Sequence, residues 1–176
     1  PEGAKIELRG GADLARSTVS IERALIHLKN LTAQNLEPVA ISFASGLEVK
    51  PATFQINKGR ASLEARITDQ QVSGRLEVRD LAAEGILPRS IPLTGNLTGQ
   101  AALTGTARQP VIQGDISLGP GRYQEFDMQS IRSSFSYRDN RLNLDGSLKT
   151  TEKGPVRTCI CQVPLSLSFI PFALSP

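Results

Sequence analysis

The side chains that most often perform catalysis or bind metals are scarce in this 176-residue sequence. His27 is the only histidine, which excludes a multi-histidine metal site and a Ser-His-Asp arrangement with a second base. Cys159 and Cys161 are the only cysteines, and two thiols one residue apart supply half of a typical metal-ligand set. The aspartates fall in turns or at polar positions of alternating segments, where solvation and turn capping are the usual roles. We therefore expect no enzymatic activity and no metal or cofactor site.

The overall composition argues against nucleic acid as a partner. The formal net charge is +3 and aromatic residues make up only 5% of the chain, with no tryptophan. Lysine and arginine are scattered singly or in twos rather than in a block, and a platform for single-stranded nucleic acid needs stacking rings. Hydrophobic residues at 39% are too many for a disordered chain. We expect a folded chain that does not bind nucleic acid.

Apolar residues recur at every second position, which is the period of a half-buried strand and not of a helix. Short polar or Gly/Pro connections separate these runs, as at residues 57–59, 69–71, 119–121 and 138–140, and such connections favour antiparallel neighbours. Residues 17–31 also fit an amphipathic helix, but we prefer strands there because the surrounding segments read as strands. The sequence predicts an all-β fold with about a dozen strands in one long, curved, mostly antiparallel sheet.

The same alternation predicts that one face of the sheet is apolar and the other is polar. The apolar positions with the clearest periodicity are Leu63, Ile67, Leu76, Val78, Leu103, Ile112, Ile116, Leu118, Phe135, Leu142 and Leu144. An open half-pipe groove would use them as its lining, whereas a closed sandwich or a solenoid would bury them in a core. Glycines in and between the strands permit the bulges and bends that a curled sheet needs. We expect the half-pipe and keep the sandwich or solenoid as the alternative.

One stretch resembles a sequence pattern that recurs in a known protein family. Residues 95–119 read GNLTGQAALTGTARQPVIQGDISLG, in which Gly105-Thr106 is followed after a short gap by Pro110, an apolar pair and Gly114. The same pattern continues from Ile131 to Gly146, as a strand, a polar turn and a second strand. The segment 59–87 also fits it. The chain therefore resembles the translocation and assembly module TamB family, the groove-forming relatives of AsmA, over roughly residues 39–149.

This resemblance implies a function and a location. Members of the family are thought to conduct phospholipids along an apolar trough between the inner and outer membranes and to support outer-membrane protein assembly and secretion. The resemblance implies a periplasmic segment, phospholipid acyl chains as ligands along the eleven residues above, and an outer-membrane partner of the β-barrel assembly type. It also implies anchorage in the inner membrane through a region missing from this sequence. The alternative is an interaction module of a surface protein, with a closed core and function on its polar face.

The chain divides into two parts on composition. Residues 1–150 carry the repeating β pattern, whereas residues 151–176 form an apolar tail that bears Pro, Ser and Cys. The tail has neither periodicity nor turn chemistry, so we interpret it as a frameshifted or disordered end in preference to a lipophilic terminus. The chain begins at Pro1 without an initiator methionine or a leader, and we interpret it as an internal piece of a longer protein.

Overall fold

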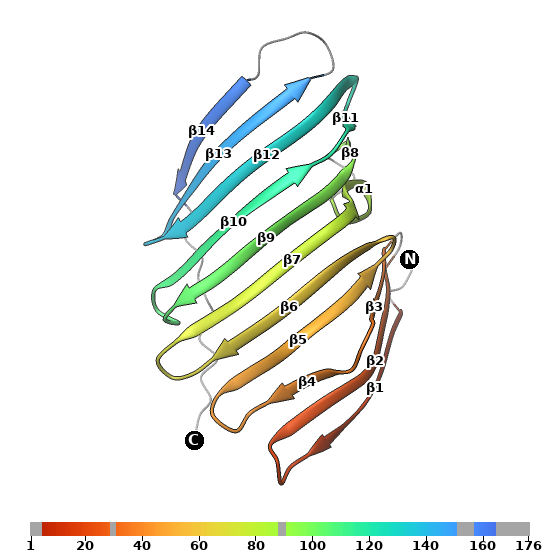
Figure 1. Cartoon of the computed structure of the whole chain (residues 1–176), viewed down its shortest axis with the longest axis vertical. Helices are drawn as coiled ribbons and strands as arrows, with labels where there is room; N and C mark the ends of the chain where they lie inside the picture. Colours follow the sequence, from red (N-terminus) through yellow and green to blue (C-terminus); the bar gives the residue numbers. More distant parts are fainter. Residues whose placement is uncertain (1–4, 29–30, 88–90, 151–156, 165–176) are drawn as a thin grey trace.

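The computed structural model describes residues 5–28, 31–87 and 91–150, together with the backbone of residues 157–164 (Figure 1). Within these ranges all the strands belong to one sheet. The strands are β1 (Lys5–Asp13), β2 (Thr18–Leu28), β3 (Leu31–Asn35), β4 (Val39–Ser42), β5 (Leu47–Ile56), β6 (Gly59–Ile67), β7 (Val72–Ala82), β8 (Leu93–Thr94), β9 (Asn96–Gly105), β10 (Pro110–Leu118), β11 (Gly121–Tyr123), β12 (Phe126–Arg138), β13 (Arg141–Thr150) and β14 (Arg157–Pro164). The single helix in the described part of the chain, α1 (Ala83–Ile86), spans four residues.

The pairings between these strands are antiparallel and mostly join neighbours in sequence. The main path of the sheet runs β1-β2-β3-β5-β6-β7-β9-β10-β12, with β13 and β14 continuing beyond β12. β4 fills the space between one half of β2 and the start of β5. The expected all-β, antiparallel sheet is therefore confirmed, and the ambiguous segment 17–31 forms strands where it is described.

Tight turns fix the register of two hairpins. In the β12–β13 turn, Asp139 and Asn140 have φ values of 51° and 59°, and in the β5–β6 turn Asn57 has φ of 50°. These left-handed conformations suit asparagine and aspartate, and a two-residue turn with positive φ matches the twist of a hairpin. The polar connections in the sequence thus set which residues face each other across the ladder.

Four irregularities interrupt the strict alternation, at Arg9/Gly10, Val49/Ala52, Val78/Leu81 and Met128/Ser130. At such a bulge an extra residue is left unpaired and the strand bends. The bulge before Leu81 returns this leucine to the same face as Val78, although the two are three residues apart. An unbroken two-residue period would have placed Leu81 on the opposite face.

The side chain of Asn35 fixes the bend in β2. Its Oδ1 accepts a hydrogen bond from the N–H of Ala24 at 2.6 Å, and its Nδ2 donates to the carbonyl oxygens of Glu22 at 3.1 Å and Glu37 at 2.8 Å. The residues of β2 before this point pair with β4, and those after it pair with β3. One asparagine therefore satisfies backbone groups that the ladder leaves free at the junction.

The compact core is small and lies at one margin of the sheet. Ala83, Leu118 and Met128 are buried together, with Leu87, Leu93, Leu97, Ile131 and Leu148 packed against them. In this cluster α1 and the short strand β8 lie against the ends of the long strands, beside β11 (Figure 1). No second sheet covers the sheet within the described residues, so the closed sandwich does not form there.

The predicted tail, residues 151–176, contains one described strand. β14 pairs with β13 within the range 151–176, while the side chains of β14 and residues 151–156 and 165–176 lie outside the described residues. The division of the chain at residue 150 and the origin of its tail remain predictions. Among the residues that the structure describes, no helix combines the length and the hydropathy required to cross a bilayer.

Candidate functional site

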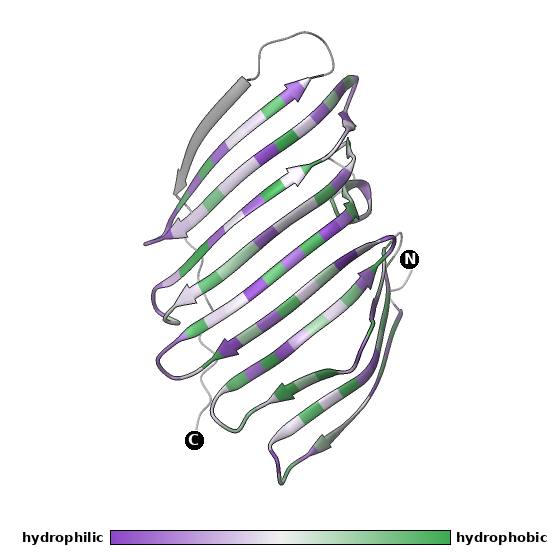
Figure 2. Ribbon diagram, in the orientation of Figure 1, coloured by the Kyte–Doolittle hydropathy of each residue, from purple (hydrophilic) through white to green (hydrophobic). Residues whose placement is uncertain are grey.

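The register of the ladders assigns almost every long strand an apolar side and a polar side. Residues that face each other across an antiparallel pair lie on the same side of the sheet, so the pairings can be followed from strand to strand. Figure 2 shows the resulting alternation of hydrophobic and hydrophilic residues along the ribbons. We call one side the apolar face; from β6 to β13 its residues are Ala61, Leu63, Ala65, Ile67, Val72, Gly74, Leu76, Val78, Leu81, Leu97, Gly99, Ala101, Leu103, Ile112, Gly114, Ile116, Leu118, Ile131, Ser133, Phe135, Tyr137, Leu142, Leu144, Gly146 and Leu148.

Continuous rows of these residues cross the strands. One row runs Leu63, Leu76, Ala101, Gly114, Phe135 and Leu144, each residue paired with the next. The next row runs Ala61, Val78, Gly99, Ile116, Ser133 and Gly146. At about 4.8 Å per strand, such rows provide an apolar path perpendicular to the strands without a charged residue in it.

All eleven residues that the sequence marked as a groove lining lie on the apolar face. Their access to solvent differs. Leu63, Ile67, Leu76 and Ile116 are 39–42% exposed, whereas Leu118 is 3% exposed because it belongs to the core cluster. The others of the eleven are half-buried: Val78, Leu103, Ile112, Phe135, Leu142 and Leu144. A ligand could reach the middle of the face directly, but not Leu118. Contact of these residues with a lipid remains a prediction.

The apolar face has two different margins. At the margin where β7 ends and β9 begins, α1 and β8 pack against the residues around Leu97 and Leu118, and β11 pairs with β8 beside them. At the opposite margin the strands are joined by short hairpin connections at residues 68–71, 106–109 and 139–140. Nothing in the sequence predicted the covering segment, because a four-residue helix and a two-residue strand are too short to leave a periodic signal.

The apolar face also continues through the first strands of the chain. Ile6 and Leu8 of β1 lie opposite Ile26 and Ala24 of β2, and they are 60% and 67% exposed. Neither residue is among the eleven lining residues that the sequence predicted. On structural grounds they belong to the same surface.

The polar face carries a network of exposed side chains. Gln100 in β9 donates from Nε2 to Asp115 Oδ1 in β10 at 2.9 Å and accepts from Arg75 Nη2 in β7 at 3.3 Å. Arg79 donates from Nε to Glu77 Oε1 at 2.7 Å. Among the described residues no charged side chain is buried. The charges are therefore solvated, and a charged surface backs the apolar one.

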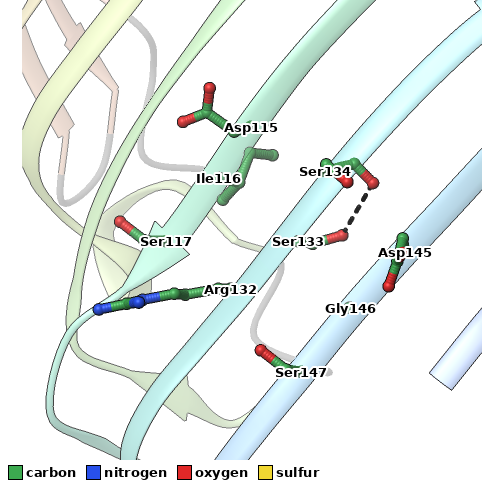
Figure 3. A pocket seen from close by; sticks show the side chains of 9 residues that line it. All are labelled: Asp115, Ile116, Ser117, Arg132, Ser133, Ser134, Asp145, Gly146 and Ser147. Carbon is green, nitrogen blue, oxygen red and sulfur yellow. Dashed lines mark hydrogen bonds between the residues drawn. The ribbon is translucent and has the colours of Figure 1, made fainter. Parts of the chain in front are cut away.

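A shallow hollow between β10, β12 and β13 contains the nearest approach to a chemical site (Figure 3). Its carboxylates, Asp115 and Asp145, both lie opposite Ser134 of the intervening strand. Two strand spacings, or about 10 Å, separate their backbones, too far for a directly hydrogen-bonded pair of the kind that shares a proton. The described residues contain no group of three or more His, Cys, Asp and Glu side chains able to hold a metal ion.

His27, Cys159 and Cys161 are the remaining residues considered for chemistry. His27 is exposed, and its Nδ1 lies 3.1 Å from Thr32 Oγ1. The side chains of Cys159 and Cys161 lie outside the described residues. Within the described residues, the feature that the structure assembles from many predicted residues is the apolar face.

In comparisons with known proteins, no family model, no curated protein and no solved structure matched this chain.

Proposed function

We propose that this chain is a section of a periplasmic scaffold that conducts phospholipids between the inner and outer membranes, with their acyl chains against the apolar face. The observation that carries the proposal is the continuity of that face: apolar rows cross β6 to β13 while Leu63, Leu76 and Ile116 remain about 40% exposed. Contiguous exposed apolar surface on a folded chain is typical of an interaction site.

The chemistry of the face suits an acyl chain better than a substrate with polar groups. A row such as Leu76, Ala101 and Gly114 offers contact to methylene groups but no hydrogen-bond donor or acceptor from its side chains. Removing apolar area from water gains about 25 cal/mol per Å². A lipid can therefore be held anywhere along the rows with similar energy, which is what movement along a scaffold requires.

The membrane context of the proposal comes from the resemblance to the TamB family. In that context the chain would be part of an inner-membrane-anchored protein that reaches an outer-membrane partner of the β-barrel assembly type and supports protein assembly and secretion there. We also propose that the sheet is curved into a half-pipe with the apolar face inside. The polar face, with its solvated charges, would then face the aqueous periplasm.

Lipid analysis of the purified chain tests this function. The protein is expressed in the periplasm of a bacterium with two membranes, purified in a mild detergent and extracted for mass spectrometry of phospholipids. We expect phospholipid in at least stoichiometric amount. A folded, lipid-free chain that also fails to take up phospholipid from vesicles would contradict the proposal and favour an interaction module whose apolar face packs against a protein.

A further inference from the structure

We propose that Arg138 and Arg141, at the end of the β12–β13 hairpin, form a clamp for a phosphate group. The two residues face each other directly across the ladder, and the Asp139-Asn140 turn between them has left-handed backbone angles at both positions. The Cβ atoms of directly opposed residues lie about 4.5–5.5 Å apart. The two arginine side chains therefore leave the backbone on the same side of the hairpin tip.

Opposed arginines occur at two other places, and there a carboxylate accompanies them. Arg9 faces Arg23, and Arg9 Nε is 3.3 Å from Glu22 Oε2. Arg60 faces Arg79, and Arg79 donates to Glu77. In each pair a neighbouring acid reduces the repulsion between the two positive charges.

The hairpin tip differs because its two arginines have no such neighbour. Arg138 and Arg141 are both exposed, and among the described residues neither takes part in an ion pair. Asp139 carries the nearest carboxylate in sequence, but it pairs with neither arginine. Like charges directly opposite each other destabilise a sheet. An anion bound between the two guanidinium groups would remove that repulsion.

Phosphate is the anion that this arrangement fits best. The guanidinium group is planar and presents paired N–H donors, which match phosphate oxygens in a bidentate manner. The clamp also adjoins the apolar face, because Tyr137 and Leu142 on that face are the next residues along each strand. A phosphate ester with an acyl chain could therefore contact both surfaces around the hairpin tip. This last step rests on the proposed lipid function, whereas the clamp itself does not.

The test compares two double variants with the same change in net charge. Arg138→Gln/Arg141→Gln removes the clamp, and Arg9→Gln/Arg23→Gln removes an opposed pair that has a carboxylate beside it. Affinity for inorganic phosphate is measured by calorimetry on the full chain, against chloride at equal ionic strength. Hydrogen bonds to a charged group are strong enough that we expect about tenfold weaker binding in the clamp variant. The control variant should bind phosphate as the parent chain does.

Three results would overturn the clamp: no phosphate binding by the parent, unchanged binding in Arg138→Gln/Arg141→Gln, or an equal loss in both variants. If the clamp variant does not fold, Arg141→Gln alone replaces it and should show the same direction of change. A second titration uses dihexanoyl phosphatidic acid below its micellar concentration. Tighter binding of this lipid than of inorganic phosphate assigns the site to a headgroup, and equal binding assigns it to free phosphate. Phosphate binding by a chain that takes up no phospholipid would leave the clamp standing and remove the lipid function.

Discussion

The aromatic ring of Phe135 lies over Gly114, its direct partner across the β10–β12 ladder. A methyl group built on Gly114 would lie 2.6 Å from Cζ and 2.9 Å from Cε1 of that ring, and it would also meet the carbonyl oxygen of Gln100. The glycine thus leaves room for the ring on the apolar face. This arrangement is a known way to support a glycine within a sheet.

Gly114→Ala is expected to destabilise the chain by about 1–3 kcal/mol, because overpacking displaces the ring and the neighbouring strand. Gly146→Ala is the matched control on the same face, since the nearest atom to its added methyl group lies at an ordinary 3.6 Å. Urea unfolding of both variants measures the difference. Equal stability of the two variants would show that Phe135 does not depend on Gly114.

Asn35→Ala should loosen the first strands of the sheet. The substitution removes the hydrogen bond to the Ala24 N–H and those to the carbonyls of Glu22 and Glu37. The partly buried N–H of Ala24, left without a partner, costs about 1–3 kcal/mol. Hydrogen exchange should accelerate at Ala24. Asn143→Ala, which removes one exposed hydrogen bond to Ser136, should leave exchange there unchanged. If Ala24 exchanges at the same rate in Asn35→Ala, the asparagine does not fix the bend.

The carboxyl group of Glu7 should titrate below its ordinary range. The hydrogen bond from Lys5 Nζ, at 2.7 Å, and then the charge of Lys5 lower the pKa of this exposed carboxyl group, with smaller contributions from Arg23 and His27. Because the folded pKa is the lower one, the interaction stabilises the fold above the unfolded pKa and is lost as pH falls through the folded pKa. Lys5→Met should raise the Glu7 pKa in an NMR titration. An unchanged pKa would mean that Lys5 is not its cause.

Ile116→Arg should leave the chain folded but prevent lipid binding. Ile116 is 39% exposed and lies between Gly99 and Ser133 in its row, so an arginine has room to remain hydrated. We expect a loss of stability of about 1 kcal/mol, whereas an unpaired charge in a closed core would cost several. Thermal melts and lipid extraction are made on the same preparation, with Arg75→Glu as the polar-face control. Global unfolding of Ile116→Arg would contradict an open face around this residue.

The sequence was sufficient for most of the long strands and for the sides of the sheet. Alternation placed Leu63, Leu76 and Leu103 on one face because a strand has a period of two residues, and the polar turns separated the strands correctly. The register itself could not be read from the sequence, since it depends on turn conformation and bulges. The register places Leu81 on the apolar face. It also pairs Arg138 directly with Arg141.

The sequence also did not predict which residues of the apolar face are buried. Leu118 and Ile116 belong to one alternating run, yet Leu118 is buried together with Ala83 and Met128 while Ile116 is open. That difference depends on α1 and β8, which pack against the face at one margin. Such short elements have no periodic pattern, so their position becomes visible only in three dimensions.

The most direct test of the lipid proposal asks what touches each face of the sheet in the cell. A benzophenone amino acid is placed at Leu76 on the apolar face or at Arg75, the preceding residue on the polar face, and the chain is cross-linked by light in the periplasm. The account predicts phospholipid attached at position 76 and at most a trace at position 75, detected by mass spectrometry of the purified chain. Protein adducts without lipid at position 76, or equal lipid labelling at both positions, would contradict it.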